Sequence, residues 1–156
     1  MNLYFKPITS ENRTQIEKLQ ILPEQNGFVE SVHDCLDEAS KRECWRPVGI
    51  YDGDTLVGFA MYGFFWQYYP FGRVWLDRLL IDYRYQKMGY GRAALSGLLE
   101  RLHREYRRKK VYLSVVDGNN NAIHLYQEMG FRFNGELDIH GEKVMIYTFS
   151  RSSSRP

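Results

Sequence analysis

The feature that most constrains the fold is a long apolar run, followed by two closely spaced glycines and then by a leucine stripe. Residues 74–81 form an apolar segment long enough for a strand covered on both faces, which we expect to be the central strand of a sheet. Residues 111–116 predict a second strand. Between them, a helix of about five turns is predicted by apolar positions at i, i+3, i+4, i+7 and i+11, namely Leu95, Leu98, Leu99, Leu102 and Tyr106. Together these segments form a right-handed crossover unit, with the glycine loop where the helix begins.

The segments before this unit predict a strand, two helices and a hairpin. Residues 3–8 read as a short strand that ends at Thr9-Ser10, a suitable cap for a weak first helix. A second helix is expected over residues 29–39, where apolar positions recur at helical spacing and acidic side chains occupy the other faces. The turn signal at residues 52–54, between two apolar segments, predicts a β-hairpin.

The segments after the unit predict one more helix and two strands. Asn119 or Asn120 can cap a helix that Gly130 ends. Residues 131–133 and 144–149 then read as strands. The predicted order is β-α-α-β-β-β-α-β-α-β-β, an α/β fold with a mixed sheet.

Length and composition agree with one compact domain. A chain of 156 residues, of which 44% are hydrophobic, can bury a core of its own. The predicted domain covers residues 1–150, and we expect the tail 151–156 to be disordered. The N-terminus carries no leader-like pattern and no window approaches about 18 apolar residues, so we expect a cytoplasmic protein with no membrane partner.

The charge balance and the cysteines argue against several other classes of protein. The net charge of +2, from 21 basic and 19 acidic side chains, gives no general case for a nucleic-acid partner. Cys35 and Cys44 lie nine positions apart without a ligand pattern around them, and the four histidines show no ligand spacing. We therefore expect free thiols and no metal site.

The loop between the central strand and the leucine helix is suited to an anion. The strand is expected to end at Asp82 and the helix to begin near Gly89, which exposes the N–H groups of the first helical turn. Gly89 and Gly91 remove side chains that would keep a diphosphate away from the backbone. A glycine pair before a helix is also ordinary turn geometry, and neither the pattern GxGxxG nor a P-loop is present. The position of the loop, after the most apolar strand, favours the ligand site.

Two motifs, in order along the chain, give the sequence a family resemblance. Residues 86–91 match R/Q-x-x-G-x-G/A, and residues 119–131 match N-x-x-A-x-x-L-Y-x-x-x-G-F. The chain thus resembles the GCN5-related N-acetyltransferase superfamily, whose order of elements agrees with the predicted one. The resemblance implies that acetyl-CoA is the cosubstrate, with its pantetheine arm paired to the end of the central strand and its diphosphate in the loop. The residues implied to contact it are Leu80, Ile81, Gln86, Lys87, Met88, Gly89, Tyr90, Gly91, Arg92 and Asn119.

Within the superfamily, the chain is similar to bacterial spermine/spermidine acetyltransferases. The similar segments are residues 47–49, 57–63, 72–78, 133–138 and 141–145. This similarity implies that the acceptor is a polyamine. The loop at residues 65–70 departs from the expectation, because it is aromatic where carboxylates would suit a polycation.

The residues expected to bind the acceptor are of two kinds. Acidic side chains around the second helix, among them Glu30 and Asp34, could face several ammonium groups, although most can equally form a solvated face. Trp66 and Tyr68 could make cation–π contacts with alkylammonium groups, or could pack against the second subunit of a homodimer.

Two residues are candidates for the chemistry. The resemblance implies that Tyr126 is the general acid that protonates the leaving thiolate, whereas a tyrosine on the apolar stripe of a helix can otherwise be a core residue. Asp77 interrupts an apolar strand, where a carboxylate is costly unless it is paired, and is the candidate base or, alternatively, an anchor for the substrate amine. An ion pair with Arg73 or Arg78 is the alternative. Capping of its helix is the alternative role for Asn119.

These inferences predict an acetyl-CoA-dependent N-acetyltransferase, acting on a primary amine by direct attack in a ternary complex. Spermidine or spermine is the expected acceptor. An antibiotic, an amino acid or a protein N-terminus is an alternative acceptor, and a non-catalytic acyl-CoA-binding module is an alternative class. One basic cluster is expected to be a solvated helix end, with a coenzyme 3′-phosphate or an acidic partner as alternatives; it contains Arg104, Arg107, Arg108, Lys109 and Lys110.

Overall fold

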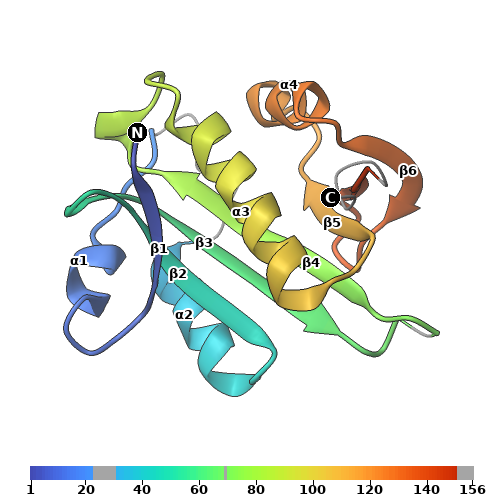
Figure 1. The fold of residues 1–156 in the computed structure, drawn as a ribbon, viewed down its shortest axis with the longest axis horizontal. Coiled ribbons are helices and arrows are strands. Elements are labelled where there is room, and N and C mark those ends of the chain that lie inside the picture. The colour runs from blue at the N-terminus through green and yellow to red at the C-terminus, as the bar shows by residue number, and fades with distance from the viewer. Residues whose placement is uncertain (23–30, 69, 151–156) are drawn as a thin grey trace, which may run out of the picture.

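The computed structural model describes residues 1–22, 31–68 and 70–150, which form a seven-stranded mixed sheet with helices on both faces (Figure 1). The strands are β1 (Leu3–Pro7), β2 (Trp45–Asp52), β3 (Thr55–Phe65), β4 (Arg73–Ile81), β5 (Lys110–Val115), β6 (Arg132–Leu137) and β7 (Lys143–Thr148). The helices are α1 (Arg13–Glu17), α2 (Val32–Lys41), α3 (Tyr90–Tyr106) and α4 (Asn120–Glu128), with a 3₁₀ turn, η2 (Tyr83–Tyr85). Apart from this turn, the order of elements is the predicted one.

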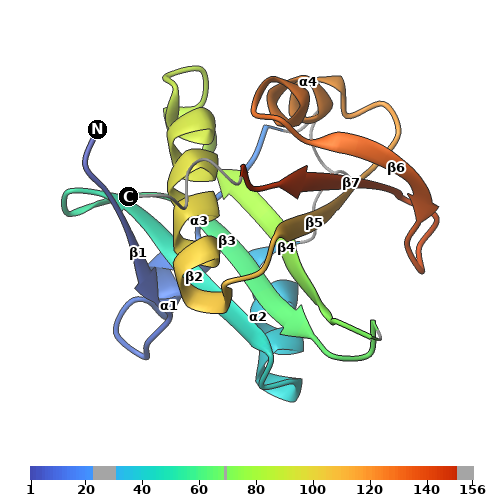
Figure 2. The same ribbon diagram turned by 45° about the vertical axis from the view of Figure 1, so that its right-hand side comes forward.

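The sheet confirms the predicted crossover unit. The strand order is β1-β2-β3-β4-β5-β7-β6, so β4 is the central strand. The pair β4–β5 is parallel, the other neighbouring pairs are antiparallel, and α3 is the connection between β4 and β5. Figure 2 shows α3 lying across one face of the sheet, with α1 and α2 on the opposite face.

The two faces of the sheet carry separate hydrophobic clusters. The leucine stripe of α3 is buried in one cluster, and α1 and α2 contribute to the other. Side chains of β4 enter both, because Val74 and Leu76 lie in the first cluster and Trp75 and Leu80 in the second. Since each fully buried leucine contributes about 1.5–3 kcal/mol, the stripe fixes α3 firmly on the sheet.

Side-chain hydrogen bonds precede the first helix and cap the second. Thr9 N–H donates to Asn12 Oδ1 (2.8 Å) and Asn12 N–H donates to Thr9 Oγ1 (3.4 Å), a reciprocal pair of the capping-box kind. These hydrogen bonds lie in the turn before α1, which begins at Arg13. The N-cap residue of α1 is Asn12, which makes no side-chain capping hydrogen bond, so the predicted cap at Thr9-Ser10 is not the cap of the helix. Ser31 Oγ accepts from Asp34 N–H (3.1 Å) and caps α2.

Some of the predictions concern residues outside the described part of the chain. These are the start of the second helix, including Glu30, and the tail 151–156. Within the described part, no helix is both long and apolar enough to cross a membrane.

Candidate functional site

The strands β4 and β5 separate after a short region of pairing. Val74 pairs with Val111 and Trp75 with Tyr112, and the pairing of the two strands ends there. Parallel strands held together at one end open a wedge toward their carboxyl ends, where ligands of α/β sheets bind. In Figures 1 and 2, α4 and the N-terminal end of α3 stand at that same end.

A β-bulge in β4 places Asp77 beside this wedge. On the edge toward β3, Leu76 lies opposite Tyr62 and Arg78 lies opposite Met61, so Asp77 is the extra residue of the ladder. A bulge bends its strand and redirects the side chains that follow, which accounts for the departure of β4 from β5. The sequence predicted a carboxylate within the strand but not the bulge that accommodates it.

The wedge contains a narrow cavity that brings the two proposed catalytic residues together. The cavity has a volume of about 30 Å³, and Asp77 and Tyr126 both line it. The other lining residues are Leu76, Arg78, Leu79, Leu113, Ser114, Val115, Asn119 and Glu142. Residues from β4, β5, α4 and the turn before β7 therefore meet in one place.

Asp77 forms an ion pair with Arg78, one of the two partners that the sequence suggested. Arg78 Nη1 lies 3.3 Å from Asp77 Oδ2, and the same nitrogen donates to the carbonyl oxygen of Asp77 (2.7 Å). Arg73, the other possible partner, instead forms two 2.9 Å hydrogen bonds with Glu136. The pair is compatible with catalysis, because Asp77 and Arg78 both line the cavity that also contains Tyr126.

Tyr126 has the protonation state that a proton donor requires. Burial raises the pKa of Tyr126 to about 12, and the positive charge of Arg78 offsets part of that increase. The phenol is therefore neutral at physiological pH and carries a proton to donate. Its ring also packs against Phe131, with 5.7 Å between the centroids, so the residue has a packing role as well.

The loop before α3 has the backbone conformation that its glycines permit. Gly89, directly before the helix, adopts φ 89°, in the left-handed region that disfavours residues with a Cβ. A Cβ on Gly91 would lie 3.5 Å from Leu125 Cδ2, so the missing side chain leaves room between α3 and α4. The first N–H groups of α3 have no carbonyl four residues back within the helix and are available to an anion.

Several side chains around this loop bond to the protein itself. Gln86 Nε2 donates to the carbonyl oxygen of Ile81 (2.9 Å), and the Tyr90 hydroxyl donates to Asp52 Oδ2 (2.6 Å). Arg92 Nη2 donates to Glu128 Oε2 (2.9 Å) and so links α3 to α4. Of the residues implied to contact the coenzyme, these three thus use their side chains for structure, while Met88 is 58% exposed.

A wider pocket of about 700 Å³ extends from the loop to the start of α4. Ile81, Gln86, Lys87 and Gly91 line one side, and residues 118–122 line the other, together with Leu22 and Leu125. Leu80, by contrast, has its side chain in the second hydrophobic cluster, where it is 7% exposed. The wide pocket and the narrow cavity are neighbours, because Asn119 lines both.

Asn119 occupies the cap position of α4 without using its side chain as a cap. The carbonyl oxygen of Asn119 accepts from Ile123 N–H (3.0 Å), but its side chain makes no capping hydrogen bond. Capping by the side chain was one of its two predicted roles. The structure therefore gives no support to that role.

Asp82 is a structural residue of the site that the sequence did not identify. It is only 1% exposed and accepts hydrogen bonds from Gln20 N–H, Arg84 N–H and Arg84 Nε. Burial alone would raise its pKa, but these hydrogen bonds and the charge of Arg84 outweigh burial and lower the pKa. Because Tyr83 N–H also donates to the Gln20 carbonyl oxygen (2.7 Å), the start of the loop before α3 is fixed to the segment after α1.

A second pocket adjoins the narrow cavity on the α2 side. It has a volume of about 230 Å³, and it shares Asp77, Arg78, Ser114 and Glu142 with the cavity. Its other lining residues are Glu38, Arg42, Trp45, Phe65, Gln67, Tyr68, Trp75, Asp138, Ile139 and His140. Four carboxylates and four large aromatic rings therefore surround one space. We call this space the acceptor pocket.

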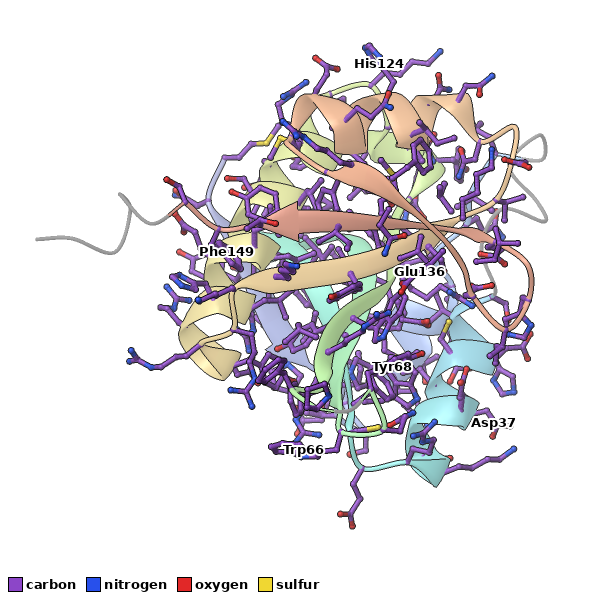
Figure 3. The ribbon with its side chains drawn as sticks, turned by 90° about the vertical axis from the view of Figure 1, so that its right-hand side faces the viewer. Asp37, Trp66, Tyr68, His124, Glu136 and Phe149 are labelled. Atoms are coloured by element: carbon purple, nitrogen blue, oxygen red, sulfur yellow. The ribbon has the colours of Figure 1, made fainter. Side chains whose placement is uncertain are left out.

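The acceptor pocket contains some of the predicted acceptor residues and excludes others. Tyr68 and Asp77 line it, whereas Trp66 and Asp34 do not. In the view of Figure 3, Tyr68 lies between Trp66, at the end of the sheet, and Asp37 on α2. Of the acidic helix, only Glu38 lines the pocket, and Glu30 lies outside the described residues.

The sequence missed the lining residues that come from the β6–β7 connection. Asp138, His140 and Glu142 approach the pocket from a turn in which Asp138 N–H donates to the Glu142 carbonyl oxygen (2.8 Å). No local pattern marks them as site residues, because the return of β6 and β7 to the sheet brings them there. Over the described residues, histidine, cysteine and carboxylate side chains form no group of three that could hold a metal ion.

Comparison with known proteins identifies the family. Residues 10–131 match the model of the acetyltransferase (GNAT) family. A spermine/spermidine N(1)-acetyltransferase of Bacillus subtilis (strain 168) is 46% identical over 149 residues, which cover 94% of this chain and 98% of that protein. A probable spermine N(1)-acetyltransferase of Bacillus subtilis subsp. natto (strain BEST195) is 45% identical over the same shares of the two chains.

A solved structure gives the same fold at lower sequence identity. Spermidine N-acetyltransferase from Vibrio cholerae, in complex with CoA and spermine, superposes with a TM-score of 0.71 at 19% identity. The match covers 94% of this chain and 95% of that one. On the extent of the family match and the identity to these relatives, the chain belongs to the acetyltransferase (GNAT) family.

Proposed function

We propose that this protein transfers the acetyl group of acetyl-CoA to a primary amino group of a polyamine, spermidine or spermine. The observation that carries the proposal is the acceptor pocket, which combines four carboxylates with four aromatic rings and adjoins the cavity that contains Tyr126. The names of the two Bacillus relatives, at 45% and 46% identity, support the same acceptor.

The lining of the pocket suits a flexible polycation. Carboxylates attract ammonium groups, and aromatic faces bind alkylammonium groups through cation–π contacts. Glu38 and Glu142 come from α2 and from the turn before β7, so they can face different ammonium groups of one chain. Arg42 and Arg78 also line the pocket, which limits its net negative charge and favours an extended amine over a compact multivalent cation.

The proposed chemistry uses Asp77 and Tyr126 on one reacting centre. Asp77 accepts a proton from the substrate ammonium, either directly or through water, which yields the nucleophilic amine. The amine nitrogen attacks the thioester carbonyl carbon, a C–N bond forms, and the C–S bond breaks. The nitrogen releases its second proton to solvent as the amide forms, and solvent returns the proton that Tyr126 gives up. Tyr126 donates its proton to the departing thiolate sulfur, and its high pKa keeps that proton available.

The proposed coenzyme site comprises the two neighbouring spaces. The first amides of α3, opened by Gly89 and Gly91, hold the diphosphate. Asn119 lies at the junction of the wide pocket and the narrow cavity, where the pantetheine arm would pass toward Asp77 and Tyr126. The open edge of β4 beyond Trp75 can pair with that arm in the manner of an added strand.

A panel of acceptors, read by release of free coenzyme thiol, tests the proposal. We expect turnover with spermidine and spermine, and much slower turnover with a short monoamine, an aminoglycoside antibiotic, an amino acid and a peptide N-terminus. Glu142→Gln should raise the KM for spermidine about tenfold, a change that corresponds to about 1.4 kcal/mol. Glu100→Gln, at an exposed position on α3, is the matched control and should leave the KM unchanged. Equal rates with and without polyamine would contradict the proposal.

We further propose that the enzyme is a cytoplasmic homodimer. The support for a dimer is the edge strand β6, whose residues are all exposed, with Phe133 at 41% and Leu137 at 64%. An exposed edge strand with apolar side chains can pair with a second copy. Light scattering coupled to gel filtration would give twice the chain mass for a dimer, and one chain mass would exclude it.

A further inference from the structure

Another pocket, distinct from the acceptor pocket, lies far from the coenzyme loop, at the opposite end of α3. We call it the rear groove; its volume is about 680 Å³. Its lining residues are Trp66, Tyr68, Pro70, Phe71, Gly72, Arg73, Val74, Arg107, Arg108, Lys109, Lys110 and Tyr112. Because α3 has 17 residues, about 25 Å of helix separates the rear groove from the diphosphate loop. The cations of the groove are thus at the wrong end of α3 to serve the coenzyme phosphates.

The rear groove has an excess of positive charge that no neighbouring acid neutralises. Arg107, Arg108, Lys109 and Lys110 are all exposed, and the lining contains no carboxylate. Within the described part of the chain, none of these four lies within 4.0 Å of an acidic group. The dipole of α3 favours cations at its C-terminal end, which accounts for Arg107 and Arg108. Lys109 and Lys110 follow the helix and begin β5, so the dipole accounts less well for them.

The same groove carries two of the most exposed aromatic rings in the described structure. Trp66 is 70% exposed and Phe71 is 77% exposed. The guanidinium carbon of Arg108 lies 4.8 Å from the Phe64 ring centroid and 5.8 Å from that of Trp66. One face of the groove therefore presents a fixed cation beside an accessible indole ring. Figure 3 shows Trp66 at the outer end of the sheet, away from α4.

Arg73, another cation of the groove, differs from the cations of residues 107–110 in that it is paired with a carboxylate. It also lines the groove, but its charge is neutralised by two hydrogen bonds with Glu136, and it packs over Tyr68 and Tyr112. The protein thus uses one arginine of the groove for structure. Among the described residues, none of the four cations from 107 to 110 has an acidic partner, and only Arg108 packs over aromatic rings, so their charge is available to a ligand.

We propose that the rear groove binds a nucleotide. Exposed aromatic rings stack on bases, and lysine and arginine side chains bind phosphate oxygens. The base would stack on Trp66 or Phe71, and the phosphates would lie against Lys109 and Lys110. The volume is within the range of roughly 300–1,000 Å³ that small-molecule sites occupy, which favours a single nucleotide over a nucleic-acid strand.

Calorimetric titration with ATP tests the proposal on the complete chain. Saturating coenzyme A is added first, because ATP phosphates could otherwise occupy the diphosphate loop. We expect ATP to bind at one site per chain, and inorganic triphosphate to bind more weakly because it has no base. Lys109→Ala combined with Lys110→Ala, and Trp66→Ala alone, should each weaken ATP binding about tenfold. The matched control combines Lys18→Ala with Lys41→Ala, two exposed lysines elsewhere on the surface, and should leave ATP binding unchanged.

Three results would overturn the proposal. The first is the absence of ATP binding when coenzyme A is bound. The second is equal binding of ATP and inorganic triphosphate, unaffected by Trp66→Ala, which would show an anion patch without base recognition. The third is much tighter binding of a single-stranded oligonucleotide than of ATP, lost in the Lys109 and Lys110 variant, which would assign the groove to nucleic acid. Because the substituted residues are exposed, the variants should keep their fold, and far-UV circular dichroism checks this directly.

Discussion

Arg78 Nη1 lies 3.3 Å from the carboxylate of Asp77 and 2.7 Å from the carbonyl oxygen of the same residue. One guanidinium group therefore contacts both the side chain and the backbone at the extra residue of the β4 bulge. Arg78 also faces Tyr126, whose pKa its charge lowers against the larger effect of burial. A single cation thus connects the two residues to which we assign the proton transfers.

Replacement of Asp77 tests whether it removes the proton of the substrate. For Asp77→Asn we expect kcat with spermidine to fall at least about 100-fold, the usual range for loss of a general base. The difference in kcat between Asp77→Asn and the wild-type enzyme should become smaller as the pH approaches about 10, where amines lose their proton without a base. Steady-state rates between pH 7 and pH 10 measure this, with Asp37→Asn as the matched control on the exposed face of α2. An increase in KM at constant kcat would instead make Asp77 an anchor for the ammonium group.

Replacement of Tyr126 tests the proton donor. Tyr126→Phe keeps the ring that packs against Phe131 but removes the hydroxyl, so we expect kcat to fall about 100-fold with little change in urea stability. Tyr147→Phe is the matched control, because the Tyr147 ring also packs against Phe131, at 5.5 Å between centroids. Nearly unchanged turnover by Tyr126→Phe would leave that residue with a packing role alone.

The buried tyrosines predict how stability changes at high pH. Burial raises the pKa of Tyr62, Tyr106 and Tyr126, the last to about 12. Above pH 10 the unfolded chain loses these protons first, so the free energy of unfolding is constant below pH 10 and falls as pH rises toward the folded pKa values. Tyr126 should contribute a decrease of at most about 1.4 kcal/mol per pH unit between pH 10 and pH 12. Urea unfolding at pH 9, 10 and 11 measures the slope, which should be shallower in Tyr126→Phe.

Replacement of Gly91 by alanine should weaken the binding of acetyl-CoA without lowering the stability of the fold. The Cβ of Gly91→Ala would lie at ordinary contact distance from Leu125, and alanine favours a helix over glycine by up to about 1 kcal/mol. The folded state should therefore be as stable as before or more so. Because Gly91 lines the wide pocket, the KM for acetyl-CoA should nevertheless rise about tenfold. Ser96→Ala, on an exposed face of the same helix, should change neither quantity. An unchanged KM for acetyl-CoA in Gly91→Ala would contradict the assignment of the loop.

The residues proposed to bind the coenzyme could be proposed from the sequence because they are local in it. The apolar run of β4, the two glycines and the leucine stripe of α3 are consecutive, and their order alone places free amides at the end of a central strand. Tyr126 and Asn119 lie on a motif of similar length, so their residue types could also be identified. Their roles remain proposals, but their positions around the wedge agree with them.

The residues that line the acceptor pocket could not be predicted from local sequence patterns. Glu38, Tyr68, Asp77 and Glu142 come from four separate segments, and no spacing in the sequence relates them. The acidic helix illustrates the difficulty, because its carboxylates look alike in sequence while, of those in the described residues, only Glu38 lines the pocket. The rotation of α2 on the sheet decides which of them is directed inward.

By itself, therefore, the sequence determined the order of the elements, the central strand, the family and the loop suited to a diphosphate. These depend on hydrophobic periodicity and on motifs that act over a few neighbouring residues. Only the tertiary structure decided that Asp77 sits in a bulge beside Arg78, that Asp82 fixes the loop to Gln20, and which carboxylates share a pocket. The reason is physical: these relationships depend on how separate elements pack and where two strands part, and packing is a property of the whole chain.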